Sequence, residues 1–366
     1  MRTADLSLLD LPRSEPIDDP EAYLRAAVRW HFSPDTGSRY WLQRAKSLEF
    51  DPLTDIKTFE DLALFPNIVD ELRDVAVRNL IPAGYGPHPP VPRVFDSGGT
   101  TGAPKRVIVM PDWDQQIVDW DVADLGGDES VRDSGLLLVC PGGPHWIGHW
   151  QARLAAALNS VYFTVDLDPR WVKKLIARGA ADEVAAYVDH IVEQAGYILR
   201  TQDVTLLMTT PPLLRAIARH DDLIEVINEK LTWIKLGGAH LDEDTRQILR
   251  EIFPNVRLLN VYGSTMVLGA AQARNAESDD EPVIHDGRAP YISFSVIDPD
   301  TGRAVPYGQR GQVVMNHISK AMFVPNNLER DTAVRLPALE GQVGDSLGDI
   351  TPVASFGGEV VIEGVY

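Results

Sequence analysis

The stretch Phe95-Asp96-Ser97-Gly98-Gly99-Thr100-Thr101-Gly102-Ala103-Pro104-Lys105 gathers glycines, hydroxyl side chains and a lysine into one short segment. Glycine permits positive φ angles and lets backbone N–H groups approach a ligand closely. Hydroxyl groups and a lysine ammonium add donors for phosphate oxygens. The stretch therefore predicts a phosphate-binding loop, and the alternative is an ordinary glycine- and threonine-rich hairpin.

This loop differs from a Walker A loop, which requires G-x-x-x-x-G-K-[ST] and leads into a helix. Here Ala103-Pro104 precedes the lysine and Arg106 follows it. The apolar run that comes next, residues 107–110, is typical of a strand. We therefore expect a phosphate loop of another type, placed between two strands.

Composition narrows the class of protein. The chain has 366 residues, 44% of them apolar, and 34 basic against 53 acidic side chains give a net charge of −19. Phosphate backbones demand a basic face, so this charge argues against nucleic acid as a partner. The single Cys140 excludes an intrachain disulfide and suits a reducing compartment. Residues 1–16 lack the apolar core of a signal peptide, and no segment is apolar enough to span a bilayer, so we expect a cytoplasmic protein without a membrane partner.

Three regions differ in their hydrophobic patterns. Residues 1–92 predict a helical N-terminal region, with helices over 21–32, 40–48 and 69–80. Residues 93–281 alternate short apolar runs with amphipathic helices, which predicts an α/β core with a mostly parallel sheet. Residues 282–366 favour short strands and form a β-rich subdomain. The strands expected in the core are Leu136–Cys140, Val161–Val165, Val204–Met208, Trp233–Leu236 and Leu258–Tyr262.

Ligands of open α/β sheets bind beyond the carboxyl ends of the strands, so the residues there are candidate site residues. Gly237-Gly238-Ala239 follows one strand and could lie against a flat ring, or form a tight turn without a ligand. Tyr262-Gly263-Ser264-Thr265 offers an aromatic ring and two hydroxyls. His145, Trp146 and His149 could line an apolar pocket; a metal site is the alternative, but the H-E-x-x-H pattern is absent. His285 and Asp286 are expected in loops.

Five short segments of the chain occur in the same order as the motifs of one enzyme superfamily. They are Ser97–Lys105, which matches [ST]-[SG]-G-[ST]-T-G-x-P-K at every fixed position, Gly237–Ala239, Asn260–Thr265 (N-x-Y-G-x-T), Gly308–Val313 and Asp331. This order resembles the adenylate-forming superfamily of acyl-CoA synthetases, nonribosomal peptide adenylation domains and luciferases. Residues 50–62 look like the phenylacetate–CoA ligase branch. The resemblance implies the superfamily's large N-terminal domain, with layered α/β subdomains and a small β-rich subdomain.

The chain departs from the superfamily pattern at two places. Met266 stands where relatives carry a glutamate that helps to hold Mg²⁺, and a thioether does not bind a hard cation. Mg²⁺ is therefore expected to be held through ATP, water and Thr265, and its protein ligands stay unknown. The sequence ends near the superfamily's hinge, around Gly348-Asp349. We accordingly expect this chain to lack the mobile C-terminal domain and its catalytic lysine.

The resemblance implies ATP-dependent activation of a carboxylic acid to its acyl-adenylate, with release of pyrophosphate. The acid implied is aromatic, with a phenazine carboxylate in antibiotic biosynthesis as the candidate, and the acceptor is a reductase, an acyl carrier or another pathway component. Two alternatives stay open: a non-catalytic nucleotide- or acyl-adenylate-binding homologue, and an enzyme completed by a partner. The implied roles are phosphate binding for Ser97, Gly98, Gly99, Thr100, Thr101, Gly102 and Lys105; adenine or nucleotide binding for Gly237, Gly238, Ala239, Tyr262, Gly263, Ser264 and Thr265; ribose binding for Asp331; catalysis for Lys105 and Thr265; and the acid pocket for His145, Trp146 and His149.

Overall fold

The computed structural model describes residues 5–97, 103–125, 127–274, 283–353, 355–356 and 359–360. The predicted phosphate-binding residues Gly98, Gly99, Thr100, Thr101 and Gly102 lie outside these ranges. Within them, one sheet of 11 strands runs through most of the chain. Its strands, in spatial order, are β10 (Ile292–Ile297), β11 (Arg310–Ile318), β12 (Phe323–Pro337), β13 (Asp345–Pro352), β9 (Ile284–Asp286), β8 (Gly269–Ala273), β7 (Arg257–Ser264), β6 (Trp233–Leu236), β5 (Leu206–Thr209), β3 (Gly135–Val139) and β4 (Val161–Thr164).

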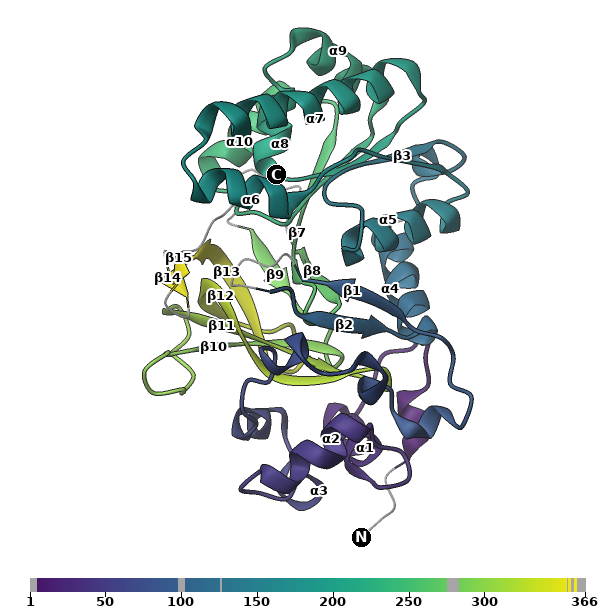
Figure 1. The fold of residues 1–366 in the computed structure, drawn as a ribbon, viewed down its shortest axis with the longest axis vertical. Coiled ribbons are helices and arrows are strands. Elements are labelled where there is room, and N and C mark those ends of the chain that lie inside the picture. The colour runs from purple at the N-terminus through teal and green to yellow at the C-terminus, as the bar shows by residue number, and fades with distance from the viewer. Residues whose placement is uncertain are drawn as a thin grey trace.

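The parallel half of the sheet comprises β4, β3, β5, β6 and the first part of β7. The strands β3, β5 and β6 are buried throughout, which is typical of parallel strands covered by helices on both faces. Apolar residues of α5 pack on one face, while α7, α8, α9 and α10 supply the core on the other. The helices of this half are α4 (Pro111–Asp124), α5 (Trp146–Ala157), α6 (Pro169–Ala177), α7 (Ala181–Thr201), α8 (Pro211–Ile217), α9 (Asp221–Lys230) and α10 (Glu243–Ile252), and Figure 1 shows α6 to α10 grouped at the top of the molecule.

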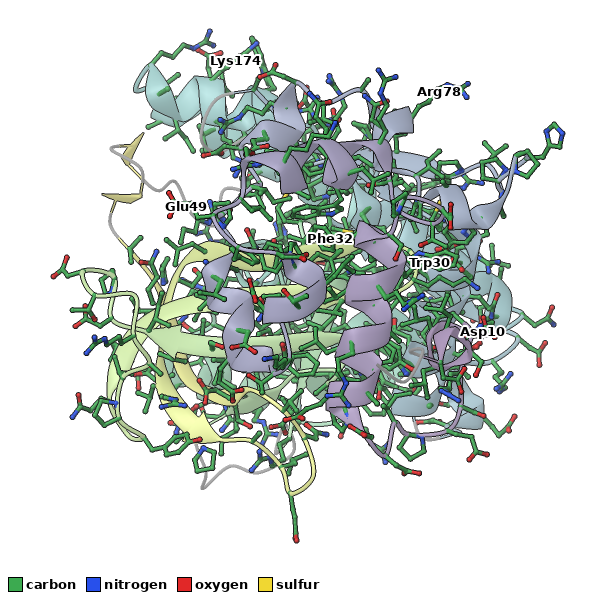
Figure 2. All side chains as sticks on the ribbon, turned by 90° about the horizontal axis from the view of Figure 1, so that it is seen from below. Asp10, Trp30, Phe32, Glu49, Arg78 and Lys174 are labelled. Carbon is green, nitrogen blue, oxygen red and sulfur yellow. The ribbon has the colours of Figure 1, made fainter. Side chains whose placement is uncertain are left out.

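The N-terminal helices α1 (Pro20–Phe32), α2 (Arg39–Arg44) and α3 (Pro52–Asp55) lie against the antiparallel half of the sheet, as Figure 2 shows from below. Side-chain donors fix this packing: Trp41 Nε1 donates to the Phe323 carbonyl at 3.0 Å, and the Tyr23 hydroxyl donates to the Ile318 carbonyl at 2.9 Å. The same apolar cluster holds residues of both regions. The N-terminal region is therefore part of the main core.

A separate hairpin carries the glycine-rich segment. It consists of β1 (Arg93–Asp96) and β2 (Arg106–Val109), which pair antiparallel. Beyond the strands, Ser97 N donates to the Lys105 carbonyl at 2.9 Å, and Lys105 N donates to Ser97 Oγ at 3.0 Å. The prediction that this loop lies between two strands is confirmed. Near the end of the chain, β14 (Ser355–Phe356) pairs with β15 (Glu359–Val360).

The core strands and most helices agree with the sequence predictions, but the helix predicted over residues 69–80 is wrong. Two 3₁₀ turns, Glu71–Arg73 and Val77–Leu80, occupy this segment. The buried residues Ile68, Val69 and Leu72 lie at the start of the segment, and Val77–Leu80 contains no buried residue, so the segment lacks the continuous apolar face that would stabilise an α-helix. The other 3₁₀ turns of the described residues are Leu6–Leu9, Ala45–Ser47, Phe59–Leu64, Ala83–Tyr85 and Glu129–Val131.

The division into regions 1–92, 93–281 and 282–366 stays a prediction. The sheet continues across the second boundary, because β8 pairs with β9. Within the described residues, no helix has both the length and the apolar character that a membrane span requires.

A buried ion pair joins α4 to the parallel sheet. Lys235 Nζ of β6 lies 2.8 Å from Asp121 Oδ2 of α4, and the lysine side chain is only 1% exposed. The same ammonium lies 5.2 Å from the ring centre of Trp150 on α5. Because the pair is buried, each charge depends on the other for compensation.

We expect Lys235→Met to lower the free energy of unfolding by about 3–5 kcal/mol, because it leaves the Asp121 carboxylate buried without a cation. Urea unfolding followed by circular dichroism measures this loss. The double variant Lys235→Met/Asp121→Leu should recover most of it, and the exposed Lys174→Met serves as the control. Equal stability of Lys235→Met and wild type would show that the pair is not buried as described.

Candidate functional site

A cavity with a volume of about 570 Å³ lies where β6 and β7 end. This volume falls in the range of small-molecule sites. Its position agrees with the rule that open α/β sheets bind ligands beyond the carboxyl ends of their strands. The walls include Gly238, Ala239, His240, Tyr262, Gly263, His285, Arg330, Asp331 and Asp349.

Tyr262 and Asp331 form the polar centre of this cavity. The Tyr262 hydroxyl donates to Asp331 Oδ2 at 2.9 Å, which joins the end of β7 to β12. Burial raises the pKa of the Asp331 carboxyl, while the hydrogen bond from Tyr262 and the nearby Arg330 guanidinium act in the opposite direction. The structure thus brings together two residues that the sequence analysis assigned to adenine and ribose binding.

The turn after β6 has a backbone that only glycine fits. A Cβ on Gly237 would lie 2.7 Å from Val261 Cγ2, and Gly238 has a φ of +78°. The first position has no room for a side chain, and the second uses a left-handed conformation that side chains disfavour. Gly238 and Ala239 consequently present their backbone to the cavity.

The segment after Tyr262 is shaped by the pairing of β7 with β8. A Cβ on Gly263 would lie 2.3 Å from the Gly269 carbonyl oxygen across the strand pair. Ser264 Oγ accepts a hydrogen bond from Met266 N at 3.2 Å, and Thr265 faces the smaller pocket described below. Met266 packs in the hydrophobic core. Its side chain therefore contributes to stability rather than to the cavity walls.

His285 lies at the cavity wall on strand β9, so the prediction that it occupies a loop is wrong. It is 4% exposed, and neither ring nitrogen has a hydrogen-bond partner among the described residues. Its ring meets the Tyr262 ring edge-on at 6.0 Å. Burial lowers the pKa of His285 to about 4, so the imidazole is neutral at pH 7. Asp286 is also on β9 and pairs with Arg274.

A second pocket of about 160 Å³ adjoins the first. Trp146 and Trp150 stack in it, with ring centres 4.8 Å apart and planes at 10°. His145 directly precedes α5, without a capping hydrogen bond from its side chain, and lines the same pocket. Burial first, and then the charge of Arg170, lowers the pKa of His145, so this ring is neutral at pH 7. The pocket is therefore aromatic, with a neutral histidine at its edge.

His149 is not among the residues that line either cavity. Its Nε2 lies 2.9 Å from Asp114 Oδ1 on α4, and its ring stacks on Phe95. Trp150, one residue further along α5, takes the pocket position instead. The four-residue spacing from Trp146 to Trp150, which places both on one helix face, could have indicated this from the sequence.

The two cavities share part of their walls: Gly238, Val261 and Gly263 line both. A ligand in the larger cavity and a ligand in the smaller pocket would therefore meet beside the end of β7. This adjacency is what a reaction between two bound substrates requires, because it converts an encounter in solution into a reaction between positioned groups.

Lys105 forms an ion pair with the N-terminal region. Its Nζ lies 3.0 Å from Asp70 Oδ1, and the two side chains are 16% and 70% exposed. Asp70 also accepts from Arg73, and Arg73 Nε donates to the Ala103 carbonyl at 3.1 Å. The segment that follows α3 in the chain thus contacts the end of the glycine-rich loop, a contact that the sequence did not indicate.

The described residues do not assemble a carboxylate site for Mg²⁺. They contain no group of three or more histidine, cysteine, aspartate or glutamate side chains placed to hold a metal ion. The Glu329 carboxyl group is hydrogen-bonded to Ser264 and Asn327, and burial raises its pKa. A Mg²⁺ ion that arrives with nucleotide phosphates can keep several waters and needs few protein ligands, and Thr265 is the residue whose chemistry and place fit such a role.

Comparisons with known proteins agree with this architecture. The sequence model of the AMP-binding enzyme family matches residues 189–322. In structure, the chain is similar to 2-hydroxyisobutyryl-CoA ligase in complex with 2-HIB-AMP, with a TM-score of 0.56 and 18% identity over 93% of this chain and 68% of that chain. The chain therefore shares the fold of this ligase, and residues 189–322 are similar to the AMP-binding enzyme family.

Curated relatives include ligases that use different acyl acceptors. A D-alanine–D-alanyl carrier protein ligase of Lactiplantibacillus plantarum is 25% identical over 263 residues, which are 70% of this chain and 47% of the relative. The 4-coumarate–CoA ligase 1 of Glycine max is 27% identical over 121 residues, which are 32% of this chain and 41% of the relative. The matches span less than half the length of these relatives. This chain is therefore similar to these ligases over part of their length.

We expect Asp331→Asn to weaken adenosine binding about tenfold or more, because hydrogen bonds to a charged acceptor contribute about 1.5–3 kcal/mol. Isothermal titration calorimetry with adenosine measures this loss. Asp300→Asn, in an exposed turn, is the control. Equal affinity of Asp331→Asn and wild type would place the nucleoside elsewhere.

We expect Asp70→Asn to raise the affinity for ATP by up to about fivefold. The exposed ion pair with Asp70 contributes about 0.2–1 kcal/mol, and this energy is lost when Lys105 leaves Asp70 to bind phosphate. Titration calorimetry with ATP tests this, with the exposed Asp74→Asn as the control. A weaker affinity for ATP in Asp70→Asn would mean that Asp70 supports the loop rather than competing for its lysine.

Proposed function

We propose that this protein activates a carboxylic acid as its acyl-adenylate at the expense of ATP. The observation that carries the proposal is the shared wall of the two cavities at Gly238, Val261 and Gly263, beside the Tyr262–Asp331 pair. The nucleotide occupies the larger cavity and the acid occupies the aromatic pocket. Their reacting ends then meet next to Thr265.

In the proposed reaction, a carboxylate oxygen of the acid attacks the α-phosphorus of ATP. A new P–O bond forms, the bond from the α-phosphorus to the bridging oxygen breaks, and pyrophosphate leaves with that electron pair. Asp331 accepts from the ribose hydroxyls, and the backbone of Gly238 and Ala239 faces the adenine. Ser97, the loop residues Gly98–Gly102 and Lys105 bind the phosphates. Mg²⁺, when bound with ATP, neutralises charge on the phosphates.

The acid in this proposal is aromatic. The stacked pair Trp146 and Trp150 provides flat apolar walls, and aromatic rings favour offset or edge contacts with such walls. The resemblance of residues 50–62 to phenylacetate–CoA ligases points in the same direction. A phenazine carboxylate used in antibiotic biosynthesis is the specific candidate, and the acceptor of the acyl group is CoA, a carrier protein or a reductase.

Acid-dependent exchange between ATP and labelled pyrophosphate tests the proposal, with benzoic, phenylacetic, coumaric and phenazine carboxylic acids as the panel. We expect exchange with at least one of these acids and a loss of roughly a hundredfold in Lys105→Ala. The exposed Lys46→Ala is the matched control. Exchange in the absence of any acid, or no loss in Lys105→Ala, would contradict the assigned roles.

The ion pair between Lys105 and Asp70 favours one second candidate, a protein that binds the nucleotide or the acyl-adenylate without turnover. Such a protein would bind ATP in calorimetry and show no exchange with any acid. Exchange that appears only after addition of a carrier protein or reductase would instead identify an enzyme completed by its partner.

A further inference from the structure

The side chain of His285 is buried at the larger cavity, and its polar atoms are unused. It is 4% exposed, and neither Nδ1 nor Nε2 has a hydrogen-bond partner among the described residues. Buried polar atoms of native proteins are bonded in the great majority of cases, so each exception needs an explanation. An imidazole with two such atoms beside a cavity of small-molecule size indicates that a ligand supplies the partner.

The strand directs this side chain to the cavity. Successive residues of a β-strand face opposite sides of the sheet. Val283 and His285, two residues apart, both line the larger cavity, whereas Ile284 and Asp286 are not among its lining residues. Asp286 instead forms an ion pair with Arg274. The alternation therefore places the imidazole on the cavity face of β9.

Two neighbouring strands hold His285 in position. In the register of the sheet it lies opposite Ala273 of β8 and opposite Leu347 of β13. Leu347 is fully buried. A side chain on the middle one of three paired strands is fixed more precisely than one on a loop, which suits a residue that has to meet a ligand at a defined place.

Tyr262 connects His285 to the proposed ribose ligand. Its ring meets the His285 ring edge-on at 6.0 Å, and its hydroxyl donates to Asp331 Oδ2 at 2.9 Å. The backbone of Gly238 and Ala239 lines the same cavity. In the proposed function the ribose binds at Asp331, so the base attached to it lies in the cavity that His285 lines.

The chemistry of the ring indicates which part of a nucleotide it fits. Burial lowers the pKa of His285 to about 4, so at pH 7 the neutral ring offers one N–H donor and one acceptor nitrogen. A phosphate only accepts hydrogen bonds and would favour a cation in its place. The edge of adenine carries acceptor ring nitrogens and an amino donor, which match both nitrogens of a neutral imidazole.

We propose that His285 hydrogen-bonds to an edge of the adenine base and is a specificity-determining residue for the nucleotide. This inference rests on the proposed function and names the side chain that reads the base. A site that hydrogen-bonds a group of its substrate rejects the analogue without that group, because the protein atom is then left buried and unpaired.

Titration calorimetry of the full chain with adenosine and four analogues tests this role. The analogues are 1-deazaadenosine, 3-deazaadenosine, 7-deazaadenosine and purine riboside, each of which lacks one hydrogen-bonding group of the base. We expect wild type to bind adenosine about threefold or more tightly than at least one analogue, and His285→Phe to bind that analogue and adenosine equally, within about twofold. Phenylalanine keeps a flat ring beside Tyr262 and removes both nitrogens. His190→Phe, at an exposed position of α7, is the matched control and should keep the wild-type preference.

Urea unfolding separates this role from a structural one. Because the described residues leave both nitrogens without a partner, His285→Phe should unfold at a urea concentration no lower than wild type does. His285→Leu, with a smaller side chain, replaces it if the phenylalanine ring does not fit. A lower unfolding midpoint together with an unchanged preference for adenosine would overturn the inference, because the nitrogens would then serve the fold.

The remaining outcomes are distinct. A wild-type protein that binds adenosine and all four analogues within about twofold would overturn the role of His285 without any variant, and acid-dependent pyrophosphate exchange would leave the proposed function intact. A wild-type protein that does not bind adenosine would overturn both. Loss of the preference in His285→Phe, with no exchange in wild type, would support the role of His285 and contradict the proposed function.

Discussion

The site depends on how β7 changes partner along its length. Its first four residues, from Arg257 to Asn260, pair in parallel with β6, and its last four, from Val261 to Ser264, pair antiparallel with β8. Because β6 ends at Leu236, the edge of β7 that it covered becomes free from Val261 onward. The glycine turn Gly237-Gly238 leaves the sheet at this point, and both cavities open against the uncovered edge. One strand therefore supplies a wall to the larger cavity and to the smaller pocket.

The buried charge on the parallel half of the sheet is compensated within the protein. Lys235 and Asp121 neutralise each other at 2.8 Å and hold α4 on the sheet, so they stabilise the fold that carries the pocket. Beside the glycine-rich hairpin, Arg170 is paired with Asp96 at 2.7 Å.

The N-terminal region contributes more than the sequence suggested. Asp70 and Arg73 contact the end of the glycine-rich loop, and Trp41 and Tyr23 anchor the region on the antiparallel strands. Lys105 is held by Asp70, a residue far from it in the chain. In the proposed function, the lysine exchanges Asp70 for phosphate, so the affinity for ATP would depend on a contact that a local motif does not reveal.

The sequence by itself determined the alternation of strands and helices, the glycine-rich hairpin and the β6 turn, because hydrophobic periodicity and the steric needs of glycine are local properties. The resemblance assigned Tyr262 and Asp331 to one nucleotide, and the structure places both at one cavity. Only the tertiary structure decided that His149 turns toward Asp114 while Trp150 lines the pocket, and that His285 is buried at the cavity wall. These positions follow from strand register and helix packing between residues far apart in the chain, and no local pattern encodes such distances.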